Sequence, residues 1–539
     1  MHMSEQELAQ VASLSPFELK DKLISIASSD AQRLMLNAGR GNPNFLATLP
    51  RWAFLMLGEF AMLEAQRTYS YLDSGFGGLP ERAGMVQRFE SFAALHRHRD
   101  GVRFLRAAFS YVGDQLGLDR EAFLCEMSAA FLGCNYPTPP RMLMHCEEIV
   151  RAYLAQEMFG ATPPAGNFSL FATEGGTAAM TYIFQSLRVN GLINRGDGIA
   201  IVTPIFTPYL EIPVLEEYGL EVVDIRMDGN ADWQLPDSEI AKLLDPRIKL
   251  LCLVNPSNPP STKLSIATLD KIAALVTSDR PDLIIVTDDV YGTFADEFVS
   301  IFAKCPRNTL CVYSFSKFFG ATGWRLGTIA LHDDNVIDEQ LARPDAGHVR
   351  SLDQRYASLT ALPGELRFID RLVADSRAVA LNHTAGLSLP QQLQMTLFAL
   401  HGLMDREGRF KDAAKGLIRH RFQTLYRHMG VPTAHGDDDV NYYTLIDLQT
   451  IGGRLYGAEF ERWFVASQLG TRFLFRLAEE TGVVLLPGKG FEVIDISARV
   501  SLANLTDAQY AAVGRFTRRV LDEYREDFRR REPADVLLA

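Results

Sequence analysis

The sequence predicts an α/β fold in which helices cover a mostly parallel sheet, and two observations lead to this prediction. First, short apolar runs alternate with amphipathic helical stretches between residues 138 and 331, and turn residues separate them. Second, the residues that could carry chemistry come directly after these apolar runs, where parallel strands place their ligand-binding residues. From residue 397 onward, amphipathic helices combine with a few short strands, which indicates a second, smaller unit.

The chain has 539 residues, of which 47% are hydrophobic, so it can form more than one domain. The stretches that flank the alternating part show the apolar spacing of helices. We therefore expect a large domain with helical insertions and a small α/β C-terminal domain. The expected units are an N-terminal arm at 1–50, a helical insertion at 51–135, the large domain at 136–332, a helical insertion with a return to the large domain at 333–396, and the small domain at 397–539.

Composition and charge exclude several classes of protein. The formal net charge of -12 argues against nucleic acid or an anionic membrane as a partner. No apolar run approaches the length of a membrane span, and the first residues lack the pattern of a secretory signal. The six cysteines form no C-x-x-C pair, as in reduced proteins, so we expect a cytoplasmic location. No His or Cys pattern indicates a metal site.

Lys317 is the first candidate for chemistry. It follows the apolar run Thr309–Tyr313, which we expect to be a buried strand, and it lies in a turn rich in serine and glycine. A lysine in such a place can form a Schiff base with an aldehyde. Ser314, Ser316 and Arg325 flank it and could bind a phosphate dianion. Taken alone, the segment could equally be a basic loop without chemistry.

Segments upstream repeat this pattern of a strand that runs into polar residues. Asp288 ends an apolar run, and Tyr291 follows three residues later. Asn258 lies in the turn after another apolar run. An Ala-rich helix begins with the small residues Gly175, Gly176 and Thr177. Small side chains leave the N–H groups at the helix N-terminus accessible, so these groups can bind an anion. The alternative for Asp288 is a helix cap.

Arg499 lies alone in an alternating segment near the C-terminal end, so we expect a strand with the arginine facing inward. A guanidinium is a bidentate partner for a carboxylate. Phe206 follows the apolar run Ile199–Val202, and taken alone it would be read as a core residue.

In their order and spacing these segments resemble the fold-type I PLP-dependent enzymes of the aspartate aminotransferase superfamily. The resemblance implies a fold-type I transferase with a large, mostly parallel seven-stranded-type sheet, and pyridoxal 5'-phosphate (PLP) as the cofactor. It assigns Lys317 the covalent bond to PLP. It assigns Asp288 the ring nitrogen, because a buried carboxylate keeps that nitrogen protonated. Tyr291 and Asn258 would bind the ring oxygen, and Phe206 would stack on the ring.

The same resemblance assigns the PLP phosphate to several residues, namely Gly175, Gly176, Thr177, Ser314, Ser316 and Arg325. Tyr136 resembles the tyrosine that reaches the phosphate of a neighbouring subunit. We therefore expect a homo-oligomer, at least a dimer, to which the helical insertions add contacts for a larger assembly. Arg499 resembles the residue that clamps the α-carboxylate of the amino acid substrate.

The segment Asn37–Phe45 resembles the part of the family that folds over the substrate. Arg40 and Gly41 lie in it, and Arg40 occupies a position that is usually small or apolar. An arginine there could meet the distal carboxylate of a dicarboxylic substrate, or it could be an exposed loop residue. Lys20, in an N-terminal segment that could also close the pocket, is more simply read as a surface lysine.

The chain length, the two helical insertions and the segment Asn37–Phe45 together resemble the aspartate 4-decarboxylases, which convert L-aspartate to L-alanine and CO2 and retain aminotransferase activity. A plain aminotransferase of aspartate or another amino acid would share every matched residue. A PLP-dependent β-elimination lyase is a further alternative. An aminotransferase-like transcription regulator would need a basic winged-helix segment, and residues 1–130 do not show one.

Overall fold

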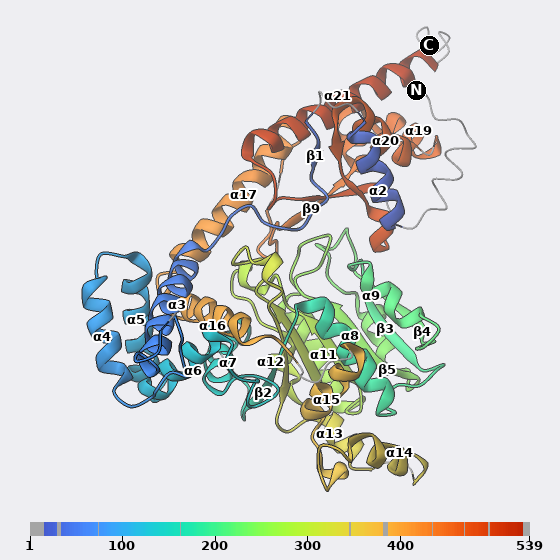
Figure 1. Cartoon of the computed structure of the whole chain (residues 1–539). Coiled ribbons are helices and arrows are strands. Elements are labelled where there is room, and N and C mark those ends of the chain that lie inside the picture. The colour runs from blue at the N-terminus through green and yellow to red at the C-terminus, as the bar shows by residue number, and fades with distance from the viewer. Residues whose placement is uncertain are drawn as a thin grey trace.

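The computed structural model has a large lobe, a small lobe and helical additions to the large lobe (Figure 1). It describes residues 16–29, 34–73, 75–161, 163–343, 346–380, 386–433, 435–467, 469–493 and 496–531. Among these residues, none of the helices combines the length and the apolar character that a membrane crossing requires.

The large lobe is built on a seven-stranded sheet with the order β2-β8-β7-β6-β5-β3-β4. Only β8 runs antiparallel to its neighbours, so the prediction of a mostly parallel seven-stranded sheet is confirmed. The strands are β2 (Phe168–Thr173), β3 (Gly198–Thr203), β4 (Glu221–Arg226), β5 (Ile248–Val254), β6 (Ile284–Asp288), β7 (Thr309–Ser314) and β8 (Gly327–His332).

Helices cover both faces of this sheet (Figure 1), which is why its central strands are buried along their whole length instead of alternating between buried and exposed residues. Ser265 accepts a hydrogen bond from the N–H of Thr268 and so begins one of these helices. The helices of the large lobe are α7 (Met144–Met158), α8 (Gly176–Val189), α9 (Pro208–Glu211), α10 (Asp237–Ile240), α11 (Ile266–Ser278), α12 (Ile301–Lys304) and α16 (Leu389–Met404).

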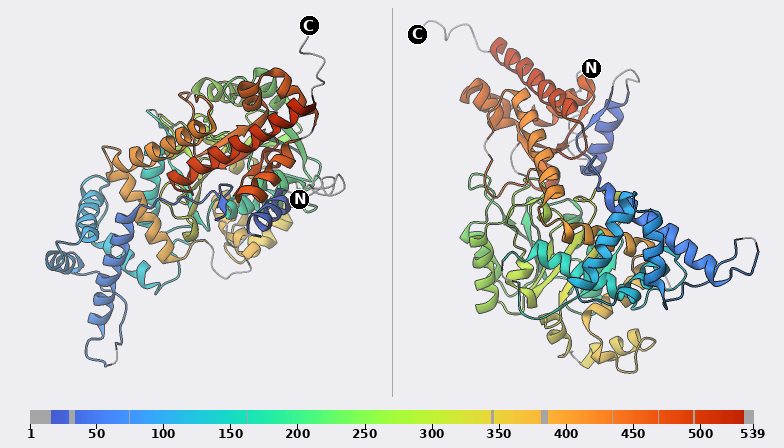
Figure 2. Two further views of the ribbon diagram at one scale, coloured as in Figure 1. Left: turned by 90° about the horizontal axis from the view of Figure 1, so that it is seen from above. Right: turned by 90° about the vertical axis from the view of Figure 1, so that its left-hand side faces the viewer.

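The first helical insertion stands out to one side of the large lobe (Figure 2). It consists of α3 (Thr48–Thr68), α4 (Met85–Leu95), α5 (Asp100–Asp114) and α6 (Arg120–Leu132). Phe60, Phe89 and Phe92 pack together inside it, with ring centroids 5.3–6.5 Å apart. Arg88 pairs with the buried Glu64 at 2.6 Å. The insertion therefore has a small core of its own.

The second insertion comprises α13 (Val336–Leu341), α14 (Ala346–Tyr356) and α15 (Phe368–Ala380). Its buried Asp375 accepts hydrogen bonds from Tyr356 at 2.9 Å and from Ser186 at 2.6 Å. Arg371, also buried, donates to Asn190 at 2.8 Å. Because Ser186 and Asn190 lie at the C-terminal end of α8, this insertion is fastened to that helix.

The small lobe contains two small sheets. The antiparallel sheet has the order β11-β12-β9, and β1 pairs with β10 in parallel. The strands are β1 (Leu36–Asn37), β9 (Tyr443–Asp447), β10 (Val483–Val484), β11 (Leu486–Pro487) and β12 (Ser497–Ser501). The helices are α2 (Pro16–Ala27), α17 (Arg409–Met429), α18 (Leu448–Tyr456), α19 (Ala458–Ala466), α20 (Leu469–Thr481) and α21 (Asp507–Arg531). Residues 34–44 thus join the small lobe although they come from the start of the chain.

Candidate active site

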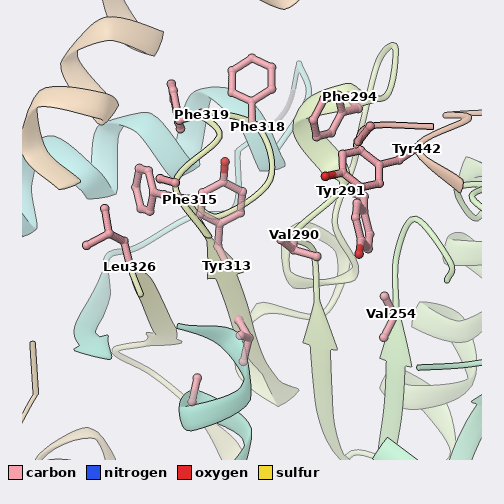
Figure 3. Packing of buried hydrophobic residues seen from close by; sticks show 14 of the residues in the cluster. Val254, Val290, Tyr291, Phe294, Tyr313, Phe315, Phe318, Phe319, Leu326 and Tyr442 are labelled. Carbon is pink, nitrogen blue, oxygen red and sulfur yellow. The ribbon is translucent and has the colours of Figure 1, made fainter. Parts of the chain in front are cut away.

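Three predicted cofactor residues lie at the carboxyl ends of neighbouring strands, Asn258 after β5, Asp288 at the end of β6 and Lys317 after β7. Figure 3 shows buried aromatic residues gathered beyond these strand ends, with Tyr291, Phe294 and Tyr442 on one side and Phe315, Phe318 and Phe319 on the other. Phe319 stacks on Phe398 of α16 with centroids 4.9 Å apart. The loop that carries Lys317 is therefore held by aromatic packing on both sides of the lysine.

Lys317 is half-buried, and its Nζ donates a hydrogen bond to the carbonyl oxygen of Gly41 at 3.1 Å. The hydroxyl of Tyr442 donates to the same oxygen at 2.8 Å. The segment that was predicted to cover the substrate therefore reaches the lysine through Gly41.

Asp288 is 8% exposed at the end of β6. Its Oδ2 accepts a hydrogen bond from the hydroxyl of Tyr209, and its Oδ1 accepts one from the N–H of Val290 at 3.1 Å. Burial raises the pKa of Asp288 above its ordinary value, although both hydrogen bonds and the charge of Lys317 act in the opposite direction. A cationic group beside it would hold it ionised.

The N-terminus of α8 and Arg325 form an anion-binding cradle. Gly175 has φ of +94°, and a Cβ on it would overlap the guanidinium of Arg325, so only glycine fits there. No side chain caps the helix, which leaves its first N–H groups available. Ser314 and Ser316 are buried beside the cradle, with their hydroxyls hydrogen-bonded at 2.8 Å. A Cβ on Gly176 would lie 3.9 Å from Asp288 Oδ2, so the cradle lies next to the carboxylate. Thr177, the third residue predicted for the cradle, is exposed.

Arg499 faces inward from β12, as predicted, and is 4% exposed. Its Nη1 donates to Asn258 Oδ1 at 3.0 Å, and its Nη2 donates to the carbonyl oxygen of Gly39 at 2.8 Å. The guanidinium lies between the rings of Tyr443 and Phe491, 4.3 and 4.6 Å from their centroids. Burial lowers its pKa, and its Nε has no partner among the described residues. Arg499 is thus a buried cation whose Nε is available to donate a hydrogen bond to a ligand.

Tyr443 was not predicted as a site residue. Its hydroxyl accepts a hydrogen bond from that of Tyr291 at 3.0 Å. Burial raises the pKa of Tyr291 well above its usual range. Burial acts in the same direction on Tyr443, but the charges of Lys317 and Arg499 and the bond from Tyr291 outweigh it and lower the pKa of Tyr443. The sequence signal was the adjacent pair Tyr442-Tyr443, which lies at the start of β9.

Tyr209 is the second residue of the site that the sequence did not predict. It follows the predicted stacking residue Phe206 by one turn, and the two rings meet edge to face at 6.1 Å. Phe206 is partly buried against the core, while Tyr209 reaches Asp288.

Three predicted residues do not join this cluster. Tyr136 is 79% exposed. Arg40 is exposed, and its guanidinium makes no hydrogen bond or ion pair within the described ranges. Lys20 lies on α2 of the small lobe and pairs with Asp21 at 3.2 Å. A separate cleft of about 980 Å³ opens between the lobes, lined by residues such as Trp233, Asp447 and Glu492, and none of the predicted site residues lines it.

Comparison with known proteins identifies the family. Residues 168–514 match the family model described as aminotransferase class I and II. The chain belongs to the class I and II aminotransferase family. It is 57% identical to the bifunctional aspartate aminotransferase and L-aspartate beta-decarboxylase of a Pseudomonas species, over 97% of this chain and 99% of that protein. Mouse kynurenine--oxoglutarate transaminase 1 is 29% identical over 31% of this chain and 41% of its own length.

Solved structures support the same fold. The aspartate aminotransferase of Thermus thermophilus, solved with maleate, has a TM-score of 0.54 at 16% identity and covers 96% of this chain and 100% of its own. An aromatic aminotransferase from Pyrococcus horikoshii has a TM-score of 0.54 at 20% identity and covers 74% of this chain and 91% of its own. These likenesses concern the fold alone.

Aminotransferases of this family use PLP, and the residues at the strand ends fit it. The cradle of α8 and Arg325 suits a phosphate dianion, and the space that a Cβ on Gly175 would take is filled by the guanidinium. Lys317 supplies an amine for covalent attachment. Asp288, buried and held by Tyr209, suits a protonated ring nitrogen. The three chemical requirements of the cofactor are therefore met by adjacent residues.

Proposed function

We propose that this protein catalyses PLP-dependent β-decarboxylation of L-aspartate to L-alanine and CO2, with residual aspartate aminotransferase activity. The observation that carries the proposal is the 57% identity, over nearly the whole of both chains, to a relative with both activities in its name. An alignment over nearly the whole chain includes the two helical insertions, whereas an alignment of the family core alone would leave them out.

The residues of the site can be given roles in this reaction. PLP, when bound, supplies an electron sink for the pair that remains when a bond to the substrate carbon breaks. Asp288 holds the proton on the ring nitrogen. Lys317 removes the proton from Cα, since its amine reaches the covering segment at Gly41 and its charge acts on Asp288. Arg499 binds the α-carboxylate through the guanidinium that Asn258 and Tyr443 hold in place.

The β-carboxylate needs a partner of its own. Arg40 belongs to the segment that contacts Lys317 through Gly41, and its guanidinium has no partner in the described chain. We therefore assign Arg40 to the β-carboxylate. In this role it must orient the breaking bond more than it stabilises the anion, because tight ground-state binding would slow the loss of CO2. Lys20, already paired with Asp21, is the second candidate.

The assembly completes the proposal. Tyr136 is exposed in the single chain, which suits a residue that serves the phosphate of a neighbouring subunit. The first insertion also exposes apolar side chains that a larger homo-oligomer would cover, among them Trp52, Leu55, Leu63 and Tyr71. Light scattering of an active preparation should give at least a dimer, and a monomeric mass would refute this part of the proposal.

The decisive experiment supplies purified holoenzyme with L-aspartate and no 2-oxo acid, and measures CO2 and alanine over many turnovers. A decarboxylase forms both continuously. A plain aminotransferase stops after one half-reaction per site and resumes only when a 2-oxo acid is added. The Lys317→Ala variant serves as the control for uncatalysed loss of CO2. Oxaloacetate without CO2 would refute the proposed function and support the plain aminotransferase.

A further inference from the structure

The side chain of Tyr443 lies close both to Arg499, the proposed partner of the α-carboxylate, and to Lys317, the proposed base at Cα. Its ring packs against the guanidinium of Arg499, 4.3 Å from the ring centroid. A methyl group on the Cα of Gly41 would overlap this hydroxyl and come within 3.2 Å of Lys317 Nζ. The hydroxyl and the amine therefore flank the same backbone atom, and the ring that carries the hydroxyl packs on the guanidinium assigned to the α-carboxylate.

The hydrogen bonds of Tyr443 leave its proton available. Its oxygen accepts from Tyr291 at 3.0 Å, and among the described residues its own O–H donates to none. The neighbouring Tyr442 differs in this respect, because its O–H donates to the carbonyl of Gly41 at 2.8 Å. Tyr443 is only 2% exposed, so a buried donor faces the site without a protein acceptor. Such a donor points to a ligand that receives its proton.

The surroundings also stabilise the anion that would remain after a proton transfer. Burial alone would raise the pKa of Tyr443, but Lys317, Arg499 and the hydrogen bond from Tyr291 lower it by more, while Asp288 acts in the raising direction. Tyr442 is buried nearby, and its own pKa is raised well above the ordinary range by that burial. Of the two adjacent tyrosines, Tyr443 is therefore the better suited to give up a proton.

We propose that Tyr443 is the acid that protonates Cβ after CO2 has left, an inference that rests on the proposed function. The bond between Cβ and its carboxylate breaks, and the electron pair stays on the substrate-derived fragment. The O–H of Tyr443 then gives its proton to Cβ, which becomes the methyl group of alanine. The tyrosinate takes a proton from water, so one aspartate and one proton give one alanine and one CO2. Lys317 remains the base for the proton at Cα.

The first test follows the configuration of the new methyl group. L-Aspartate that carries deuterium in one of its two Cβ positions is decarboxylated by the holoenzyme in tritiated water, and the chirality of the alanine methyl is analysed. The wild type should give one configuration, because a fixed acid adds the proton from one side. Tyr443→Phe should give a mixture, and decarboxylation should slow by about 10²–10⁴-fold, the usual contribution of a general acid.

Tyr442→Phe is the matched control, since it removes a neighbouring hydroxyl that is already engaged with Gly41. It should retain a single methyl configuration. Exchange of the Cα proton of aspartate into solvent reports Lys317 separately, and it should persist in Tyr443→Phe, which also shows that the variant is folded and loaded. A single configuration at a near-normal rate in Tyr443→Phe overturns the proposal. A wild type that releases no CO2 overturns the proposed function, and the role of Tyr443 with it.

The second test does not depend on turnover. In cofactor-free protein, the ultraviolet absorbance of tyrosinate is followed during a pH titration of wild type, Tyr443→Phe and Tyr442→Phe. The difference between wild type and Tyr443→Phe should contain one tyrosine that ionises below the ordinary value of about 10. The difference for Tyr442→Phe should contain none. If the Tyr443 difference appears only at higher pH, the charges of Lys317 and Arg499 do not act on this hydroxyl and the proposal fails.

Discussion

The unfolding free energy of the Asp289→Asn variant, compared with that of the wild type, should rise as the pH is raised from acidic to alkaline. Asp289 is fully buried beside Asp288. Its Oδ1 accepts a hydrogen bond from Thr287 at 2.6 Å, and its Oδ2 accepts one from the thiol of Cys311 at 3.5 Å. These bonds oppose but do not cancel the effect of burial, which raises its pKa from 3.8 to about 7.

The sign and size follow from linkage. The folded state keeps the proton of Asp289 up to about pH 7, whereas the unfolded chain releases it near 3.8. Wild-type stability therefore falls as the pH rises through this window and is level above it. With about 1.4 kcal/mol for each pH unit, ionisation costs on the order of 4 kcal/mol in all, of which about 3 kcal/mol is lost between pH 5 and pH 8. The side-chain amide of the Asp289→Asn variant has no such ionisation.

The assay is chemical denaturation of both proteins at about pH 5 and pH 8, compared as the difference of their unfolding free energies. That difference should shift in favour of Asp289→Asn by about 3 kcal/mol over the window. Asp245→Asn is the control, because the neighbouring Arg247 lowers the pKa of Asp245 to about 2, outside the window. An equal difference at both pH values would show that Asp289 is already ionised in the folded protein, and the argument from burial would be refuted.

Three further outcomes are expected at the site. Lys317→Ala should still bind PLP but lose the covalent link and turnover, and borohydride reduction with peptide mapping should label Lys317 in the wild type; a label on another lysine would contradict this. Asp288→Asn should retain the cofactor yet lose activity by orders of magnitude, because the electron sink acts mainly in the transition state; a near-normal rate would mean that another residue faces the ring nitrogen. Arg40→Ala should lower the ratio of alanine plus CO2 to oxaloacetate, whereas Arg499→Ala should depress both products together; an unchanged ratio in Arg40→Ala would move the role to Lys20.

The sequence was sufficient to predict the positions of residues at a strand end. Lys317 and Asp288 each follow a continuous apolar run, and such runs predict both the buried parallel strand and the edge at which its ligands lie. Arg499 was predicted to face inward because it stands alone in an alternating segment. The strand is β12, Ser497–Ser501, with Arg499 at its central position.

Contacts between distant segments could not be predicted in this way. Tyr209 meets Asp288 across 79 positions, and Tyr291 meets Tyr443 across 152. No local pattern marks such pairs, because a tyrosine after a strand is equally suited to core packing. The sequence also could not predict the direction in which the side chain of Arg40 points, because the orientation of a loop residue depends on the surface against which its loop packs. The burial of Asp289 follows from its place directly after β6, a strand that is buried along its whole length.

The bond between Arg499 and the carbonyl of Gly39 joins positions 460 residues apart, and this separation has a consequence for biosynthesis. All seven strands of the large sheet are complete once His332 has been made. At about 5–20 residues per second, β12 follows on the order of ten seconds later or more. During that interval a nascent chain can form the phosphate cradle while Gly39 and Gly41 still lack their partners from the small lobe. If the cradle and Arg499 have the proposed roles, we expect PLP binding to precede amino acid binding during synthesis.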